Sequence, residues 1–406
     1  MAYSRHFDLI DQKYVEGKYI LGNPNRDRTC AAIFWQDGEL WDEAFKYLLH
    51  KSLYLKSVQA ITSHLTRYAC WLEETGTDWR SFPKEEYDRC IYQFSGYLKN
   101  NSELSDSSAN SRLNAVIDFY RFAKLHNLID RNIELWREKG VYIRCFENTY
   151  FERTIRKSVA QLPRRIKRKG EIKYPHGVKP RSLEDRNILL KYLKGKKSKK
   201  PLYLMLLIGF LTGARQGTIR TLTYQSLLNA LPHNTYKKHY VVQAGQGSEV
   251  ESKNGKNISI FFHEDLLKGL IQYAETDPDQ LKRRAKANKE NIGLIFLTRQ
   301  SKPYSDGSIT ELMSMLRKEL IFNGLEQFHD FKFHDTRGTC ARYLISTWME
   351  SGIEYAIDRA REWLGHENEE TTRRYVERIQ FEEQSEVFNQ LYDQEFLPPW
   401  FSGGIS

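Results

Sequence analysis

Cysteine is scarce in this sequence, and the few cysteines stand alone. Five are spread over 406 residues, and no two of them form a CxxC pair. A structural zinc site needs clustered cysteine and histidine ligands, and a disulfide framework needs a dense set of cysteines. The sequence therefore predicts neither a metal site nor disulfides, and it is typical of a protein from a reducing, intracellular compartment.

Long apolar runs are also missing. The longest one, LYLMLLIGFLT at residues 202–212, has about half of the roughly 20 residues that a membrane-spanning helix needs. It lies in the middle of the chain, far from the position of a secretion signal. We interpret it as a buried helix of a globular domain and expect no membrane partner.

Acidic residues are nearly absent from one segment. The whole chain has 62 Lys and Arg against 52 Asp and Glu, a net charge of +10. Residues 153–200 contain 18 basic and three acidic residues, so this segment carries +15 and the remainder of the chain carries −5. Clustered positive charge binds phosphates and releases counterions, which indicates a nucleic-acid partner. A basic linker that is merely solvated is the alternative interpretation.

Upstream of this segment, apolar residues recur at helical spacing. Residues 44–130 are predicted to form several amphipathic helices, packed as a bundle. The run SSANSR at residues 107–112 is expected to cap the last helix, which places Asn110 and Arg112 near a helix N-terminus, where phosphate contacts are favoured. Residues 1–43 show no strong periodicity, and the sequence leaves their role open.

Downstream of the basic segment, the pattern is mixed. Two apolar segments, residues 240–243 and 258–261, are predicted to pair as a β-hairpin, and a further short strand is predicted at 294–297. Helices are expected at residues 182–194, 201–212 and 264–275, and then on to about residue 393. This half is therefore expected to be an α-rich α+β domain. Prolines and glycines break the helical pattern within the basic segment, which favours an interdomain connector.

Four short motifs in the downstream half place a cation, an imidazole or a phenol beside a turn or a helix end. Each one alone has an ordinary structural explanation. Together they suit phosphoryl transfer on a diester, because guanidinium groups match nonbridging oxygens, lysine or histidine can protonate a departing alkoxide, and tyrosine can attack phosphorus. The motifs are TGAR ending at Arg215, SKNGK with Lys253 and Lys256, HDTR with His334 and Arg337, and LGH with His366, followed after nine residues by Tyr375.

The order and spacing of these motifs resemble those of the tyrosine recombinase, or phage integrase, family. The resemblance implies a multidomain protein with an all-α, SAM-like core-binding domain and an α-rich α+β catalytic domain that contains a small β-hairpin. The domains expected on this basis are an N-terminal extension at 1–43, a helical DNA-binding domain at 44–152, a basic linker at 153–180, a catalytic domain at 181–378 and a tail at 379–406.

The resemblance also implies a role for each motif. Tyr375 would attack the scissile phosphate, which gives a 3′-phosphotyrosyl link and a free 5′-hydroxyl. Arg215, Arg337 and His366 would stabilise the transition state, a task suited to preorganised cations. Lys253 would protonate the departing 5′-oxygen. No metal or other cofactor is required, because the phosphotyrosine keeps the bond energy.

Several assignments stay open at this stage. His334 is expected to act as a base toward the tyrosine, and Lys256 competes with Lys253 as the general acid. Many family members have an acidic residue three positions after the first arginine, where this chain has Thr218, so the site needs other support. The nucleophile has rivals that lack the spacing after LGH: Tyr343, Tyr355 and Tyr392.

The sequence thus predicts a site-specific DNA recombinase that integrates and excises a mobile element. The expected partners are double-stranded recombination sites, three further copies of the chain in a synaptic tetramer, and an accessory directionality or bending factor. The expected setting is the cytoplasm, with a bacterial or phage-encoded protein on the nucleoid. The tail would pack either in cis or on a neighbouring protomer.

Two alternatives remain: a DNA-relaxing or end-resolving phosphotyrosine enzyme, and a non-catalytic DNA-binding or architectural protein on the same scaffold. The DNA backbone is expected to contact residues of the helical domain and of the connector. These are Asn110, Arg112, Arg164, Arg165, Lys167, Arg168 and Lys169.

Overall fold

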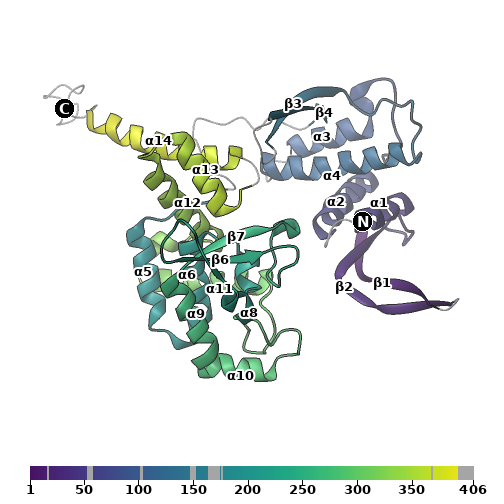
Figure 1. Ribbon diagram of the computed structural model, residues 1–406. Helices are drawn as coiled ribbons and strands as arrows, with labels where there is room; N and C mark the ends of the chain where they lie inside the picture. Colours follow the sequence, from purple (N-terminus) through teal and green to yellow (C-terminus); the bar gives the residue numbers. More distant parts are fainter. Residues whose placement is uncertain are drawn as a thin grey trace. The chain divides into compact units, whose positions relative to one another are not determined.

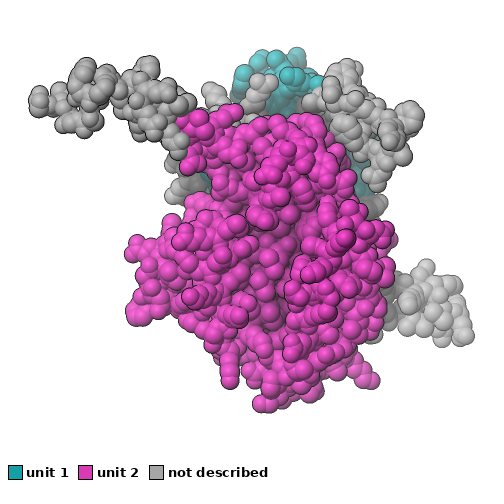
Figure 2. All heavy atoms as spheres, turned by 60° about the vertical axis from the view of Figure 1, so that its left-hand side comes forward, with its two compact units in different colours: residues 1–168 teal, residues 169–406 magenta. Residues whose placement is uncertain are grey.

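The chain divides into two compact units, residues 1–168 and residues 169–406 (Figure 2). The division falls inside the basic segment. The structure, a computed structural model, describes residues 1–15, 18–52, 58–100, 104–146, 152–162, 174, 177–366 and 369–391.

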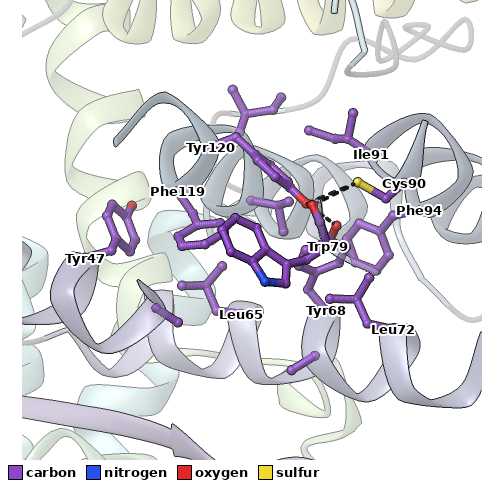
Figure 3. Packing of buried hydrophobic residues seen from close by; sticks show 14 of the residues in the cluster. Tyr47, Leu65, Tyr68, Leu72, Trp79, Cys90, Ile91, Phe94, Phe119 and Tyr120 are labelled. Atoms are coloured by element: carbon purple, nitrogen blue, oxygen red, sulfur yellow. Dashed lines mark hydrogen bonds between the residues drawn. The ribbon is translucent and has the colours of Figure 1, made fainter. Parts of the chain in front are cut away.

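The first unit is built around a helical bundle, as the periodicity predicts. Its buried centre is rich in aromatic rings, and two of the tyrosine hydroxyl groups are hydrogen-bonded to each other (Figure 3). The Oη atoms of Tyr68 and Tyr120 lie 2.6 Å apart, and Tyr120 donates to the carbonyl of Trp79 at 2.7 Å. The helices are α1 (Asp42–Ser52), α2 (Gln59–Thr75), α3 (Cys90–Asn100) and α4 (Asp106–Leu125), with a 3-10 turn, η1 (Glu86–Asp88).

The start of helix α4 differs slightly from the prediction. Its N-cap is Ser105, whose Oγ accepts a hydrogen bond from the backbone N–H of Ser108 at 3.2 Å. The run at residues 107–112 therefore lies inside the first two turns and does not cap the helix. Serine is a good N-cap at either position, but Asp106 within the first turn favours the earlier start, because its negative charge complements the helix dipole.

A long β-hairpin precedes the bundle, where the sequence shows no periodicity. Strand β1 (Tyr3–Val15) pairs antiparallel with β2 (Lys18–Phe34), and the register shifts twice along β1. Such irregularities break the strict apolar alternation by which a strand is recognised, which explains why the pattern is silent. The base of the hairpin lies beside helices α1 and α2 (Figure 1), and its residues Ala31 and Ile33 are fully buried in the bundle core.

A second hairpin follows helix α4. Strands β3 (Glu138–Phe146) and β4 (Glu152–Ala160) pair in one continuous antiparallel register. Strand β4 occupies the beginning of the basic segment, which the sequence predicts to be a connector. The high density of basic residues conceals this strand, because few apolar positions remain to show a period of two. Residues 177–200 of the segment belong to the second unit.

The second unit is α-rich with one small sheet of order β5-β6-β7. The predicted hairpin is confirmed, with Val241 opposite Phe261 and Gln243 opposite Ser259. Its elements are α5 (Leu183–Lys194), η3 (Lys197–Lys199), α6 (Lys200–Thr212), α7 (Gln216–Arg220), α8 (Tyr224–Leu228), β5 (Leu231–Pro232), β6 (His239–Ala244), η4 (Lys253–Gly255), β7 (Ile258–His263), α9 (Glu264–Thr276), α10 (Pro278–Lys286), α11 (Asp306–Phe322), η5 (Glu326–Phe328), α12 (Phe333–Met349), α13 (Ile353–Leu364) and α14 (Glu369–Leu391).

The predicted strand at residues 294–297 is wrong. Leu294 and Leu297 each form only an isolated β-bridge, to Thr223 and Pro303 respectively. The residues between them are fully buried, so the apolar run reflects a path through the core and not strand pairing. The apolar run at 202–212 does form a buried helix, α6, as expected. Among the described helices, none has the length and apolar character needed to cross a membrane.

Candidate active site

Arg337 connects three of the four motifs. It lies near the start of helix α12 and is only 4% exposed. Its Nη1 donates a hydrogen bond to the carbonyl of Gly213 and its Nη2 to the carbonyl of Leu364, both at 2.6 Å. Gly213 belongs to TGAR and Leu364 to LGH. One guanidinium therefore joins segments that lie far apart in the sequence.

The charge of Arg337 is poorly compensated. Burial, together with the smaller effect of the nearby positive charge of Arg215, lowers the pKa of its guanidinium to about 9. The two carbonyls that accept its hydrogen bonds are neutral. A buried cation in such surroundings is stabilised by an anion, so this position favours a negatively charged ligand.

The TGAR turn is held in a single shape. Gly213 ends helix α6 with φ 68°, and a Cβ atom at this position would lie 2.5 Å from Cδ2 of Leu364. Only glycine satisfies both the left-handed backbone and the close approach. The Oγ1 of Thr212 accepts a hydrogen bond from the N–H of Ala214 at 3.1 Å. Arg215 then emerges, half-buried, as the N-cap of helix α7.

Thr218 does not supply the support that an acidic residue would give here. Its side chain is 2% exposed, and its Oγ1 has no hydrogen-bond partner within the described part of the chain. The carbonyls of Gly213 and Leu364 instead hold Arg337. Sequence reasoning missed this arrangement, because a backbone acceptor has no signature in the side chains.

Asp335 fixes the start of helix α12. It is 1% exposed, and its carboxylate accepts hydrogen bonds from the N–H groups of Lys179 at 2.9 Å and Lys332 at 2.8 Å. Arg181 adds an ion pair at 3.7 Å and donates its N–H to Thr339 at 2.9 Å. Residues 179–181 of the basic segment are thus anchored on the helix that carries Arg337.

His366 and Tyr375 lie together on either side of the start of helix α14. The two rings stack with centroids 6.2 Å apart and planes 13° from parallel. The Nδ1 of His366 is hydrogen-bonded to the Oγ1 of Thr372 at 2.8 Å, which fixes the imidazole. The pattern did not single out Thr372, because it is one of several polar residues between LGH and the tyrosine.

Tyr375 is a buried phenol near a cation. It is 3% exposed, and burial raises its pKa to about 12, while the positive charge of Arg337 opposes this rise. The same charge coupling would stabilise a phenolate or a phosphate ester at this oxygen. Among the rival tyrosines, Tyr343 and Tyr355 are 52% and 46% exposed. Tyr392 lies outside the described residues.

Lys253 begins the 3-10 turn η4 in the connection between β6 and β7, and its side chain is exposed. This connection is tied to the end of helix α7, because Glu251 donates its N–H to Oγ1 of Thr221 at 3.0 Å and pairs with Arg220 at 3.5 Å. Lys256 is exposed as well, so the structure does not choose between the two lysines.

His334 is the second residue of helix α12 and is exposed. Its spacing of three from Arg337 is helical, as predicted, but the two residues differ in exposure, since Arg337 is buried. The structure therefore brings four of the predicted residues close together: Arg215, Arg337, His366 and Tyr375. Lys253 and His334 lie at exposed positions.

The predicted DNA contacts in the first unit are less distinctive. Asn110 and Arg112 are both half-buried on helix α4. Burial and the charge of Arg112 lower the pKa of His64, so this arginine lies beside helix α2. The five connector residues Arg164, Arg165, Lys167, Arg168 and Lys169 lie outside the described residues. Nowhere in the described ranges do three or more His, Cys, Asp or Glu side chains gather as a metal site would need.

Comparison with known proteins gives a family match and similar solved structures. Residues 183–380 match the model of the phage integrase family. The chain is similar to the Tn1549 transposon integrase in complex with transposon right end DNA, with a TM-score of 0.50 and 13% identity over 85% of this chain and 98% of that one. At this identity the similarity supports the fold alone.

Two further solved structures have lower TM-scores, and we draw no conclusion from them. One is the XerH site-specific recombinase bound to palindromic difH substrate, with a TM-score of 0.48 and 14% identity over 78% of this chain and 75% of that one. The other is a lambda integrase dimer bound to a core site, with a TM-score of 0.41 and 14% identity over 77% and 88%. No curated protein matches the sequence.

The family match spans all four motifs in their expected order, on a fold that joins three of them through one arginine. Residues 183–380 therefore form a domain of the phage integrase family.

Proposed function

We propose that this protein is a tyrosine recombinase that cleaves and rejoins DNA strands at specific sites through a 3′-phosphotyrosyl intermediate on Tyr375. The observation that carries the proposal is the position of Arg337, whose guanidinium is held by the carbonyls of Gly213 and Leu364. The charge of this guanidinium lowers the pKa of Tyr375, and the charge of Arg215 lowers the pKa of Arg337 itself. Two cations beside a phenol suit attack on a phosphodiester.

In the first step, the phenolic oxygen of Tyr375 bonds to phosphorus as the bond from phosphorus to the 5′-oxygen breaks. With a pKa of about 12 the phenol is protonated at neutral pH, so its proton must be removed during attack, and we assign this task to His334. Lys253, or Lys256 in its place, supplies a proton to the departing 5′-oxygen. Attack by a 5′-hydroxyl of another strand reverses the step.

During this step Arg215, Arg337 and His366 hold the nonbridging oxygens. A guanidinium fork can face two of these oxygens, and Arg337 is already oriented by its two carbonyl contacts. The hydrogen bond between Thr372 and Nδ1 of His366 keeps the imidazole in place. Such preorganisation is worth more in a buried site than in water, because the site does not reorganise as charge develops.

The substrate that we propose is duplex DNA carrying the ends of a mobile element, integrated and excised by a tetramer of this chain. The segment 153–200, with its charge of +15, supports a polyanionic partner. The similar Tn1549 integrase is bound to transposon DNA in its structure. We also propose a cytoplasmic, nucleoid-associated setting and an accessory directionality or bending factor.

Incubation with nicked suicide duplexes that carry the ends of the chain's own element tests the proposal. We expect an SDS-resistant protein–DNA band with wild type and none with Tyr375→Phe. Tyr343→Phe is the matched control, because Tyr343 is exposed on helix α12, and it should keep the band. A wild type that binds these duplexes without forming the band would make the chain a DNA-binding protein only. Relaxed circles or hairpin ends in place of exchanged strands would identify a relaxing or end-resolving enzyme.

A further inference from the structure

A second tyrosine covers the proposed nucleophile. Tyr174 lies outside all four motifs, nine residues before helix α5, and is 9% exposed. Its ring packs against the ring of Tyr375, with centroids 5.5 Å apart and planes at 49°. Both residues belong to one buried cluster of the second unit, together with Trp363 and Leu364. Tyr375 therefore contacts Tyr174 in addition to its stack on His366.

The hydroxyl of Tyr174 is tied to the helix that carries Tyr375. It donates a hydrogen bond to Oε2 of Glu382 on helix α14 at 2.9 Å. Glu382 also pairs with Arg342 of helix α12 at 3.0 Å and with Arg378 at 2.9 Å. The guanidinium of Arg378 lies over the ring of Tyr174, 5.8 Å from its centroid. A partly buried network thus fixes Tyr174 to two helices, each of which carries a residue of the candidate site.

This packing conflicts with the chemistry proposed for Tyr375. A phenol that is 3% exposed cannot bring its oxygen to a phosphate of a duplex unless some of its neighbours move. Arg337 and His366 are needed beside the phosphate, whereas Tyr174 offers a second aromatic ring at the nucleophile. The departure of Tyr174 from Tyr375 would thus cost the site no catalytic group.

We propose that Tyr174 is a positioning residue that holds Tyr375 in a covered arrangement, and that Tyr375 leaves this contact when it attacks DNA. The covered arrangement depends on the ring of Tyr174 and, to a smaller degree, on its hydrogen bond to Glu382. The consequence for cleavage rests on the function proposed above, but the covering itself does not. The two parts can be tested separately.

The first test measures how accessible Tyr375 is in the full-length protein without DNA. Tetranitromethane nitrates exposed tyrosines through the phenolate, and mass spectrometry of the peptide that contains Tyr375 gives its rate. We expect Tyr174→Ala to raise this rate about tenfold, since each unit by which a pKa falls toward its ordinary value increases the phenolate fraction tenfold. Tyr174→Phe keeps the ring and should give a smaller increase. Tyr343→Phe should leave the rate unchanged, and an equal rate in wild type and Tyr174→Ala overturns the proposal.

The second test measures formation of the covalent complex on a suicide duplex at saturating DNA, from pH 7 to pH 9. We expect Tyr174→Ala to react several-fold faster at each pH, with the affinity for DNA unchanged. A slower reaction would mean that Tyr174 braces the active arrangement, which contradicts a covering role. If no variant forms the complex while nitration follows the expected order, the proposed function fails and the covering of Tyr375 stands.

Two variants that retain the ring of Tyr174 keep the proposal testable if Tyr174→Ala does not fold. Glu382→Gln weakens the partner of the Tyr174 hydroxyl and should raise nitration of Tyr375 to the same degree as Tyr174→Phe. If both variants fold and both match wild type in nitration and in the rate of covalent complex formation, the network does not hold Tyr375 and the inference is wrong.

Discussion

Both units bury tyrosines, but the neighbours of these tyrosines differ. In the first unit, Tyr68 and Tyr120 share a hydrogen bond, and Tyr120 also donates to a backbone carbonyl (Figure 3). Burial raises the pKa of both phenols well above the ordinary value, and their hydrogen-bond partners are neutral hydroxyl, thiol and carbonyl groups. In the second unit, burial raises the pKa of Tyr375 to about 12, and the guanidinium of Arg337 opposes the rise.

This comparison distinguishes a structural phenol from the phenol that we propose as the nucleophile. Burial alone is shared by both regions and therefore carries no functional information. What differs is a buried cation near the phenol, held by carbonyls and lacking a compensating anion in its hydrogen bonds. Such a group costs free energy in the absence of a ligand, so its presence indicates that a ligand supplies the missing charge.

Among the variants that test this comparison, Arg337→Lys is expected to have the largest effect on the chemistry. A single ammonium group cannot donate to both carbonyls in the geometry of the guanidinium fork, although it keeps the positive charge. We expect the rate of covalent complex formation to fall about 10²- to 10³-fold. The affinity for DNA should change by less than tenfold. Arg374→Lys is the control, because Arg374 is exposed on helix α14, and wild-type rates in Arg337→Lys would refute the assigned role.

The next effect concerns binding and involves the connector. Replacement of Arg164, Arg165, Lys167, Arg168 and Lys169 by glutamine should weaken binding to all duplexes alike. Each lost phosphate contact should flatten the slope of log K against log salt by about 0.9. Titrations at several salt concentrations measure this slope, and an unchanged slope would mean that the basic run is only a solvated linker.

The fold was predictable where one face of an element is buried in a regular way. The helices of both units and the pairing of β6 with β7 follow from periodicity. The first hairpin did not, because its register shifts disrupt the pattern, and residues 294–297 are apolar without being a strand. For the candidate site, motif spacing indicated the side chains, but not the carbonyls that hold Arg337.

The contact between Tyr174 and helix α14 shows a further limit of sequence reasoning. Tyr174 and its hydrogen-bond partner Glu382 are 208 positions apart, and neither belongs to a motif. Thr218 shows the reverse case, since the sequence indicated a missing acid there, and the structure indeed leaves a buried hydroxyl without a partner in the described part of the chain. Local patterns cannot specify contacts of this kind, because tertiary packing alone creates them.

For the buried phenols of the first unit, Tyr120→Phe should destabilise the fold without affecting covalent complex formation. The change removes the donor to the carbonyl of Trp79 and a partner of Tyr68. We expect a loss of about 1–3 kcal/mol in the free energy of unfolding. Urea denaturation measures this loss, and the rate of covalent complex formation at saturating DNA should match wild type. A slowed reaction would show that the buried phenols of the first unit are not merely structural.

The smallest effect is expected from Thr218→Val. The two side chains have nearly the same shape, and the change removes a buried hydroxyl that has no partner among the described residues. We expect the free energy of unfolding to stay the same or to rise by about 1 kcal/mol, because an unpaired buried hydroxyl is unfavourable. A loss of stability in urea denaturation would show that the hydroxyl is needed.

The most direct test of the account is to locate the covalent bond. The SDS-resistant complex from a suicide duplex labelled at its 3′ side would be digested with trypsin and nuclease, and the modified peptide sequenced by mass spectrometry. We expect a nucleotide attached through its 3′-phosphate to Tyr375, and a free 5′-hydroxyl on the other DNA fragment that accepts a phosphate from polynucleotide kinase. Attachment to Tyr343, Tyr355 or Tyr392, or through a 5′-phosphate, would contradict the account.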